Sequence, residues 1–293
     1  MMFKKECQCE PDNGHDMPYT LPPFYRKAML QSRRFLGIIM VILLWYLASW
    51  WVDYQLGVEF PTPVITVIRL LDLLAGEQIY SHSIYTHVTA SLIRWGAGYL
   101  LAVIFGIGLG SFLGFSRTAH EIFMPAMYIF QLIPGLAWIP IALLLFGIGN
   151  TATIFMIFMT SLVPIVINTS GGIRDVPPIY VHTARNMGAS LTEIFFRVMF
   201  PASVLSMING LRIGLAGGWR VLIAAEMIVG VGTGIGYSIE MSRWTLDFRA
   251  AFAFIMVILA IGLLIERILF EVIERKIIYN IGVSNNERKI PGM

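Results

Sequence analysis

Charge is scarce in this chain. Only 13% of its 293 residues are Asp, Glu, Lys or Arg, and 57% are hydrophobic. A soluble protein of this length needs far more charge to cover its surface, so the composition excludes that class. Several apolar runs approach or exceed about 18 residues, the length at which a helix crosses the hydrocarbon core of a bilayer. The composition therefore predicts an all-α polytopic membrane protein.

Residues that bind metals or carry out catalysis are also few. The two cysteines, Cys7 and Cys9, lie near His15 in a polar N-terminal tail, and three candidate ligands fall short of a four-ligand zinc site. The other histidines are scattered, and the apolar runs hold no histidine pair, Ser–His arrangement or carboxylate cluster. We therefore expect free thiols, no metal, no cofactor bound by this chain and no enzyme active site. The net charge of +3 gives no indication of nucleic-acid binding.

Six apolar stretches predict six membrane-spanning helices. They cover approximately residues 35–52, 91–115, 122–148, 151–168, 202–229 and 250–265. Two intervals, Pro61–Gly76 and Gly232–Trp244, are too short or too polar to cross and are expected at the outer surface. The expected organisation is a tail over residues 1–34, a transmembrane domain over residues 35–275 and a second tail over residues 276–293.

Basic residues predict the orientation, because cytoplasmic loops carry an excess of Lys and Arg. With both termini inside, the two tails and the segment before the fifth span hold most of the positive charge. The outer loops then hold only Arg69, Arg243 and Arg249. The sequence therefore predicts cytoplasmic N and C termini. The polar start of the chain is not expected to be a cleavable signal peptide, because its apolar run comes too late and is too long.

The second and third spans suggest different uses. Gly106, Gly110 and Gly114 recur every fourth residue, so they share one helix face and predict close helix packing. The third span contains Pro134 and Pro140, which break a helix and free backbone carbonyls inside the membrane. Such breaks often line a translocation path, although structural helices also contain kinks. We assign Gln131, Pro134 and Trp138 of this span to a candidate path.

The fifth span carries the strongest anomaly. Arg220 and Glu226 lie deep within it, where each is costly unless it faces protein or water. Six residues of helix leave the two side chains roughly 120° apart around the axis, so pairing within the helix is unfavourable. Each is expected to find a partner on another helix or in a second copy. We assign Trp219, Arg220 and Glu226 to the candidate path, with a structural ion pair as the alternative.

A polar, basic, helix-forming segment, HTARNMGASLTEIFFRVMFP, lies between the fourth and fifth spans. Its order of small residues, glycine and proline resembles the cytoplasmic coupling loop of ABC importer permeases, which docks on the ATP-hydrolysing subunit. Where that family usually has Glu-Ala-Ala, this chain has His-Thr-Ala. We call residues 172–201 the coupling segment. The resemblance implies contact with the ATPase by His182, Thr183, Ala184, Arg185, Asn186, Gly188 and Pro201. Pro201 is interpreted as the end of the segment.

The resemblance extends over most of the chain, from Phe60 to Ile278. Blocks such as MPAMYIFQLIPGLAWIPIALLLFGIGNTATIF and LRIGLAGGWRVLIAAEMIVG follow in the same order as in type I ABC importer permeases of the nitrate, sulfonate, taurine and bicarbonate branch. This resemblance implies a homodimer in a bacterial inner membrane, two ATP-binding subunits that hold ATP and magnesium, and an extracytoplasmic binding protein. The chain has no GxxxxGK[ST] loop, which fits ATP hydrolysis on a separate subunit.

The resemblance and the arginine in the fifth span together favour a small anionic solute. Permeases of the same family for aromatic acids or for a neutral vitamin or pyrimidine precursor are the first alternative. An ion-driven secondary transporter is the alternative from another class. Such transporters usually contain internal repeats with matching broken helices, whereas this sequence shows one broken helix and no convincing repeat.

Overall fold

The computed structural model describes residues 23–57, 59–230 and 232–267, and the chain forms two compact units that divide at Pro63. In the first unit, α1 (Pro23–Leu56) contains the predicted first span. Near its end the Trp45 indole donates a hydrogen bond to the Pro61 carbonyl (3.0 Å), and the Ser49 hydroxyl donates one to the Phe60 carbonyl (2.7 Å). These bonds fold the segment after α1 back along its last turns. Cys7, Cys9 and His15 lie outside the described residues.

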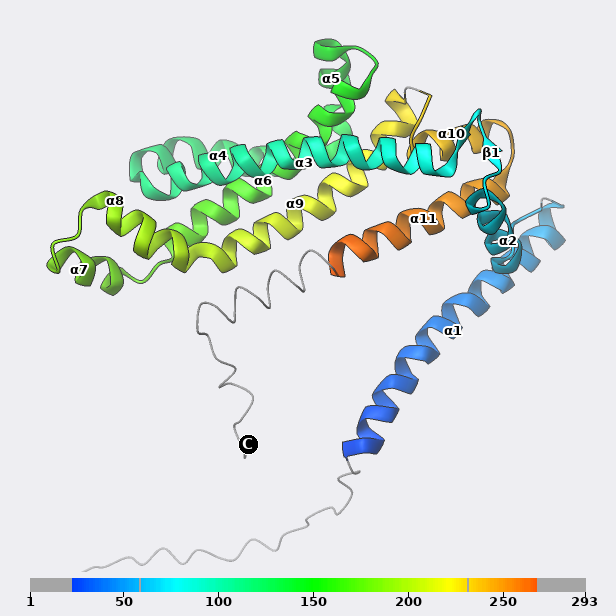
Figure 1. Ribbon diagram of the computed structural model, residues 1–293, viewed down its shortest axis with the longest axis horizontal. Helices are drawn as coiled ribbons and strands as arrows, with labels where there is room; N and C mark the ends of the chain where they lie inside the picture. The colour runs from blue at the N-terminus through cyan, green and yellow to red at the C-terminus, as the bar shows by residue number, and fades with distance from the viewer. Residues whose placement is uncertain (1–22, 58, 231, 268–293) are drawn as a thin grey trace, which may run out of the picture. The chain divides into compact units, whose positions relative to one another are not determined.

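The second unit holds the remaining elements, coloured by residue number in Figure 1. A short helix and a hairpin come first: α2 (Pro63–Leu74), β1 (Gln78–Ile79) and β2 (His82–Ser83). The helices that follow are α3 (Ile84–Phe115), α4 (Arg117–Leu132), η1 (Gly135–Trp138), α5 (Ile139–Phe146) and α6 (Asn150–Arg174). The chain continues through α7 (Pro178–Asn186), α8 (Leu191–Ile194), η2 (Phe195–Met199), α9 (Phe200–Val229), α10 (Ile235–Trp244) and α11 (Phe248–Glu266).

The structure agrees with about six spans. Five helices of the described chain are long and apolar enough to cross a membrane, and α4 together with η1 and α5 makes a sixth if this bent pair is counted as one span. The two halves of this sixth span are bent by 104° at the break that contains Pro134. The intervals expected at the outer surface contain only the short helices α2 and α10, with 12 and 10 residues.

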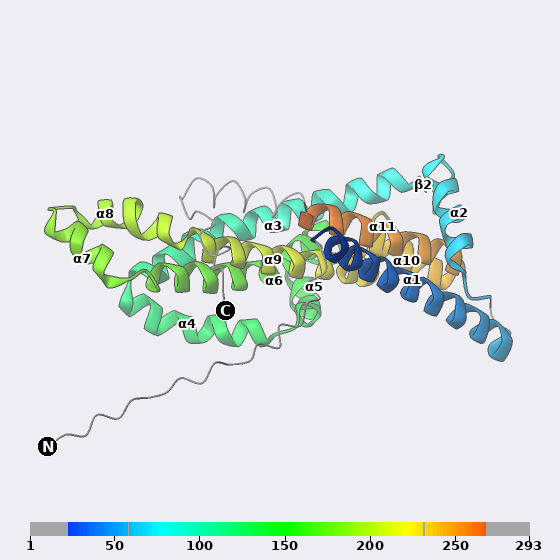
Figure 2. The same ribbon diagram turned by 90° about the horizontal axis from the view of Figure 1, so that it is seen from below.

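The helices α3, α6 and α9 pack side by side and form the centre of the second unit (Figures 1 and 2). Glycines make the close approach between α3 and α6 possible. A Cβ atom added to Gly106 would lie 2.7 Å from Ile165 Cγ2, and one added to Gly110 would lie 2.7 Å from Thr169 Cβ. The predicted packing role of these glycines is therefore confirmed. On α9, a Cβ atom at Gly214 would lie 2.8 Å from the Ser161 carbonyl of α6.

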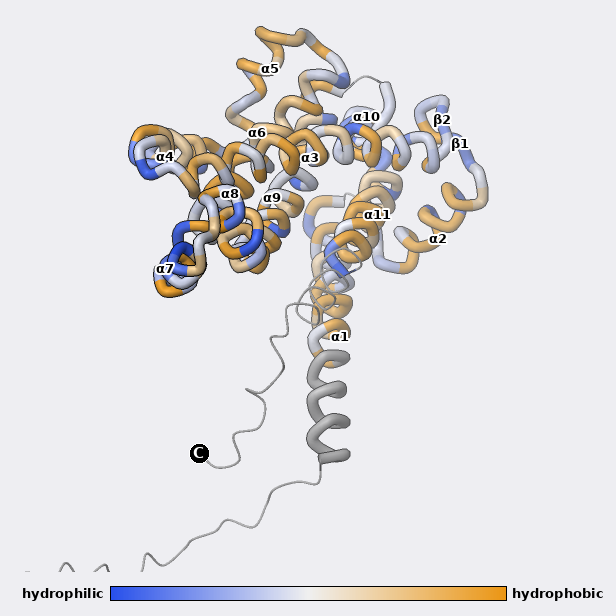
Figure 3. The backbone as a smooth tube through the Cα atoms, turned by 60° about the vertical axis from the view of Figure 1, so that its left-hand side comes forward, coloured by the Kyte–Doolittle hydropathy of each residue, from blue (hydrophilic) through white to orange (hydrophobic). Residues whose placement is uncertain are grey.

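The second unit has two distinct ends. The helices α7 and α8 lie at one end, and the β1–β2 hairpin and α10 lie at the other, in both views of the ribbon (Figures 1 and 2). Figure 3 shows hydrophilic positions gathered in α7 and around the hairpin, whereas the central helices are mostly hydrophobic between them. This distribution fits a bundle whose middle lies in lipid and whose two ends lie in water.

Candidate functional site

The coupling segment presents α7 to solvent. Two prolines begin this helix, with Pro178 at its first position, where a missing backbone N–H costs no hydrogen bond. Six of the seven predicted contact residues are exposed, and Ala184 is half-buried. The large apolar side chains of Ile179, Tyr180 and Met187 are also exposed. The segment therefore offers polar and apolar contact groups to a partner on one short helix.

Gly188 ends α7 through its backbone conformation. Its φ of +86° is left-handed, the Ala189 N–H donates to the Ala184 carbonyl (3.1 Å), and the Gly188 N–H donates to the Arg185 carbonyl (3.0 Å). This pair of bonds is the Schellman motif, which favours glycine at this position. Apart from its two chain neighbours, no described residue comes within 4 Å of a Cβ atom added here. The glycine is therefore explained by the turn itself, whether or not another surface approaches it.

The interpretation that Pro201 ends the coupling segment is wrong. Ser190 and Glu193 form a capping box at the start of α8, and the helix then continues without interruption from Leu191 to Val229. Proline is tolerated because the preceding turn, η2, is a π-helix in which the Phe200 N–H donates to the Phe195 carbonyl. The wider turn relieves the clash that proline otherwise makes with the carbonyl four residues earlier. As a result, one helix joins the coupling segment to α9.

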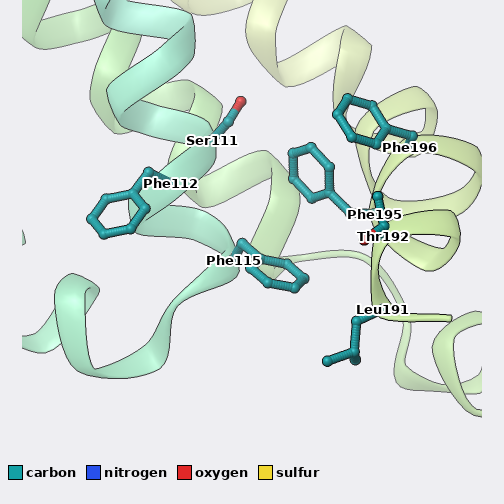
Figure 4. A pocket seen from close by; sticks show the side chains of 7 residues that line it. All are labelled: Ser111, Phe112, Phe115, Leu191, Thr192, Phe195 and Phe196. Atoms are coloured by element: carbon teal, nitrogen blue, oxygen red, sulfur yellow. The ribbon is translucent and has the colours of Figure 1, made fainter.

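The end of α3 packs against this helix through aromatic side chains. The Phe115 and Phe195 rings meet edge to face with centroids 5.4 Å apart, as Figure 4 shows. A cavity of about 380 Å³ lies beside them, lined by Ser111, Phe112, Phe115, Leu191, Thr192, Phe195 and Phe196. None of these residues is charged, so the cavity, which lies between the end of α3 and the coupling segment, is mostly apolar and offers no ionic binding group.

Three residues of the candidate path meet at a second cavity. Gln131 of α4, Trp138 of η1 and Arg220 of α9 line a space of about 170 Å³ together with Thr160 and Gly217. The Phe130 ring, 6.0 Å from that of Trp138 between centroids, adds an aromatic wall. Pro134 is the N-cap residue of η1 and is exposed, but it is not among the residues that line this cavity. The broken third span and the fifth span thus contribute to one cavity, which we call the Arg220 cavity. Its lining is mostly apolar, with Gln131, Thr160 and Arg220 as the polar groups.

Arg220 itself is exposed and has no acidic partner among the described residues. Its Nε donates only to the Ala216 carbonyl, one turn earlier, at 3.0 Å. The guanidinium also borders another cavity, of about 480 Å³, which lies between α9 and α11 and includes Trp219 and Glu266 in its lining. Trp219 is buried on that side and meets Trp95 edge to face. Arg220 therefore stands at the border between two cavities.

Most exposed residues of α9 form a single stripe. A spacing of three or four residues places six of them on one face of the helix: Ala202, Leu205, Asn209, Ile213, Ala216 and Arg220. Pro201 and Ile228 are also exposed, outside this spacing. Beside this stripe the Asn209 amide donates to the Asn168 amide oxygen of α6, at 3.4 Å. Neither asparagine was predicted from the sequence. The signal was present for Asn209, because it precedes Arg220 by eleven positions, which is about three helical turns, and therefore lies on the same helix face.

Glu226 lies elsewhere, in a fully buried cluster. Its carboxylate is 1% exposed and accepts hydrogen bonds from the Ser91 hydroxyl (2.8 Å), Arg94 Nη1 (2.5 Å) and the Gly236 N–H (2.9 Å). It lines neither cavity that borders Arg220. The expectation that Glu226 avoids lipid is confirmed. Of the two roles considered, the structural ion pair describes its surroundings, with Arg94 rather than Arg220 as the partner.

The sequence held a signal for this pair that the analysis did not use. Glu226 is the only acidic residue within the six predicted spans, and Arg94 lies in the second of them. An arginine inside the membrane requires counter-charge or water, so the one available acid was a candidate partner. Three arginines in the predicted spans compete for it, namely Arg94, Arg212 and Arg220. Only the arrangement of α3 against α9 selects among them.

Comparison with known proteins agrees with this architecture. Residues 102–279 match the family described as "Binding-protein-dependent transport system inner membrane component". The chain is 30% identical to the taurine transport system permease protein TauC of Escherichia coli over 235 residues, which cover 79% of this chain and 84% of TauC. It is 33% identical to the bicarbonate transport system permease protein CmpB of Synechococcus elongatus, over 79% of this chain and 84% of CmpB.

Two further similarities are informative. The chain is 40% identical to the nitrate import permease protein NrtB of Synechocystis over 152 residues, 52% of this chain and 55% of NrtB. Its fold is similar to a chain of the MetNI methionine ABC transporter in an inward-facing conformation, with a TM-score of 0.56. That match has 19% identity and covers 65% of this chain and 94% of the other, and it supports the fold alone.

Proposed function

Because this chain belongs to the inner membrane components of binding-protein-dependent transport systems, the permeases of ABC importers, we propose that it conducts a small oxyanion along the stripe of α9. The observation that carries this proposal is Arg220, an exposed arginine at membrane depth that borders the Arg220 cavity and has no acidic partner among the described residues. A guanidinium keeps its proton even in a membrane. It therefore needs water or a counter-charge, and a passing anion supplies that charge.

The relatives support this class of cargo. TauC, NrtB and CmpB are named for taurine, nitrate and bicarbonate, each of which carries an oxyanion group. Arginine binds such groups through two parallel N–H···O bonds, and Gln131 and Thr160 line the same cavity with further polar groups. The cavity thus combines one fixed positive charge with neutral polar groups. This combination favours binding that is strong enough for entry and weak enough for release.

A second copy of the chain completes the path. The helix α9 is covered by α3 and α6 but leaves one stripe, with Asn209 and Arg220, uncovered. An arginine and an asparagine on an otherwise apolar stripe are unfavourable against lipid, and a two-fold axis beside the stripe brings two such pairs together around water. The homodimer therefore presents two copies of Arg220 to one cargo ion.

ATP hydrolysis takes place on two separate ATP-binding subunits, which hold ATP and magnesium. The exposed α7 of the coupling segment docks on them from the cytoplasm, with His182, Thr183, Arg185 and Asn186 as polar contacts. The end with the hairpin and α10 faces outward, and an extracytoplasmic binding protein delivers the cargo there. This orientation places both termini in the cytoplasm, as the distribution of basic residues predicts.

An aromatic acid is a second candidate cargo. The rings of Phe130 and Trp138 stand beside Arg220 in one cavity, so a carboxylate on an aromatic ring finds both a charge and a stacking surface.

Uptake by the reconstituted complex tests the proposal. The chain is co-purified with its ATP-binding subunit and binding protein, placed in liposomes and supplied with taurine, nitrate, bicarbonate or benzoate. We expect ATP-dependent uptake of one of these anions. Arg220→Gln should reduce it about tenfold or more, because a charged hydrogen bond is lost, and Arg220→Lys should restore part of it. Arg117→Gln, at an exposed arginine of α4, is the matched control. Wild-type uptake by Arg220→Gln contradicts the proposed role.

A further inference from the structure

The first turn of α10 is capped by side chains of other helices. The N-cap residue is Gly234, which has no side chain to accept a hydrogen bond. Three successive amides of this turn instead donate to buried side chains of α3 and α9: Gly234 to His87 Nδ1 (3.1 Å), Ile235 to Ser91 Oγ (2.8 Å) and Gly236 to Glu226 Oε2 (2.9 Å). The start of α10 therefore depends on α3 and α9 for all three hydrogen bonds.

Both charged side chains of this cluster, Arg94 and Glu226, have hydrogen-bond partners. The Glu226 carboxylate lies at the positive end of the α10 dipole, where a negative charge is favourable. Arg94 neutralises it through Nη1 (2.5 Å) and uses its other two nitrogens to donate to Thr233 Oγ1 (3.0 Å) and Asn150 Oδ1 (2.7 Å). One arginine thus joins the end of α9, the loop before α10 and the first residue of α6. We call Ser91, Arg94 and Glu226 the Glu226 cluster.

The contact between α9 and α10 leaves no room for sliding. A Cβ atom added to Gly234 would lie 2.6 Å from the Glu226 carboxyl carbon, and one added to Gly236 would lie 2.2 Å from the Ile223 carbonyl oxygen. On its other side, α10 is joined to the hairpin by the Tyr80 hydroxyl, which donates to Ser242 Oγ at 2.9 Å. The backbone of α10 therefore packs directly against side chains at the end of α9, and α10 is also hydrogen-bonded to the hairpin.

The opposite end of this same helix is the coupling segment. From Leu191 to Val229 the chain is one helix of 39 residues, which runs from the α7–α8 end of the second unit to the α10 end (Figures 1 and 2). A buried ion pair contributes little net stability compared with apolar residues of the same shape, because both charges must be desolvated. What the Glu226 cluster does provide is a fixed geometry between α10 and this helix.

We propose that Arg94 and Glu226 are positioning residues for coupling: they make α10 and α9 move as one body, so that a displacement of the outer surface reaches the coupling segment. This inference rests on the proposed importer function, since the binding protein supplies the displacement. Docking outside moves α10, the Glu226 cluster transfers the movement to α9, and the continuous helix carries it to α7 and α8. Arg220, which lies between the two ends, moves with the same helix.

The test uses the double variant Arg94→Gln/Glu226→Gln, which keeps the shape of Glu226, replaces Arg94 by a shorter polar side chain and leaves no buried charge unpaired. In the complete complex in lipid nanodiscs, ATPase activity is measured without the binding protein and with the binding protein saturated by the cargo found in the uptake assay. We expect basal activity to stay near wild type and the ratio of stimulated to basal activity to fall about fivefold or more. Ser91→Ala should lower the ratio in the same direction, to a smaller extent.

Hydrogen exchange provides the second measurement and needs no cargo. The Gly236 amide should exchange roughly tenfold faster in the double variant, because its acceptor changes from the Glu226 carboxylate to a neutral amide oxygen. The amides of Gly234 and Ile235, whose acceptors His87 and Ser91 are unchanged, should follow in the same direction because the first turn of α10 loosens, whereas the amides in the second half of α6 should not change. The matched control is Arg117→Gln/Glu121→Gln, which neutralises an exposed ion pair on α4. A double variant with normal stimulation, or with exchange as slow as in the wild type, overturns the positioning role. A wild-type complex without stimulation overturns the proposed function, and this inference with it.

Discussion

Two charged residues on α9, six positions apart, have opposite surroundings. Glu226 is buried, and its carboxylate is paired with Arg94, Ser91 and the Gly236 N–H. Arg220 is exposed, touches one backbone carbonyl and borders two cavities. Charges within a membrane are costly in both cases, yet of the two only Glu226 has a charged partner among the residues that the structure describes. The difference separates a charge that fixes the protein's geometry from a charge that is available to a ligand or to water.

The first prediction concerns the direction in which α9 crosses the membrane. Its expected effect is the largest, because each introduced cysteine should be either labelled or not labelled in intact cells. In a chain with Cys7→Ser and Cys9→Ser, Gln78→Cys near the Glu226 end should react with an impermeant maleimide in intact cells. Asn186→Cys on α7 should react only after lysis. Both positions are exposed, so access alone decides the result. The reverse pattern would place the Glu226 end inside and overturn the assignment of the outer surface.

The second prediction compares the stability of two single variants. Glu226→Ala strands the Arg94 guanidinium in a buried site and should lower the free energy of unfolding by about 3–5 kcal/mol. Arg220→Ala removes an exposed side chain without an acidic partner and should change it by less than about 0.5 kcal/mol. Detergent melting of both proteins measures the difference. Equal losses of stability would show that Arg220 is also a structural residue.

The third prediction tests the access of water to the two sides of α9. Ala216 lies on the exposed stripe beside Arg220, whereas Ala225, next to Glu226, is 0% exposed. In the cysteine-free chain, Ala216→Cys should react with a charged methanethiosulfonate roughly tenfold or more faster than Ala225→Cys, because the reactive thiolate forms only in water. The substitutions are identical, so they serve as controls for each other. Comparable rates would remove the support for a water-filled path along the stripe.

The smallest expected effect lies at the far end of the same helix, in the turn that follows α7. Gly188→Ala should destabilise this turn by about 1 kcal/mol, since a left-handed φ disfavours a Cβ atom. Gly188→Asn should be tolerated better, because asparagine also adopts this conformation. Circular dichroism will barely detect the change, so hydrogen exchange of the amides of residues 184–189 is the suitable measurement. Slower or unchanged exchange in Gly188→Ala would contradict this explanation of the glycine.

The sequence predicts only part of the difference between the surroundings of Arg220 and those of Glu226. The cost of each charge and the angle of roughly 120° between them follow from helix geometry alone. These arguments predict correctly that the two residues do not pair and that Glu226 avoids lipid. They do not indicate which helix supplies the partner, because Arg94 is 132 positions away along the chain. Contacts of that separation depend on how the spans pack.

The effect of a proline on a helix is also only partly predictable from the sequence. The sequence predicts that Pro134 breaks the third span, and the break is present, with a bend of 104°. The same reasoning fails for Pro201, where a π-turn absorbs the ring and the helix continues. Whether a proline breaks a helix depends on the hydrogen bonds that the preceding turn can adopt. A residue pattern does not contain that information.

By itself the sequence determined the membrane class, the approximate number of spans, the glycine face of α3 and the anomaly of the fifth span, because each depends on hydrophobicity and helical periodicity. The tertiary structure decided which face of α9 is covered, and therefore that Arg220 borders a cavity while Glu226 is enclosed. It also decided that α10 is capped by His87, Ser91 and Glu226. Burial and long-range hydrogen bonds arise from the packing of helices. Local periodicity shows which residues share a helix face but does not show which helix packs against that face.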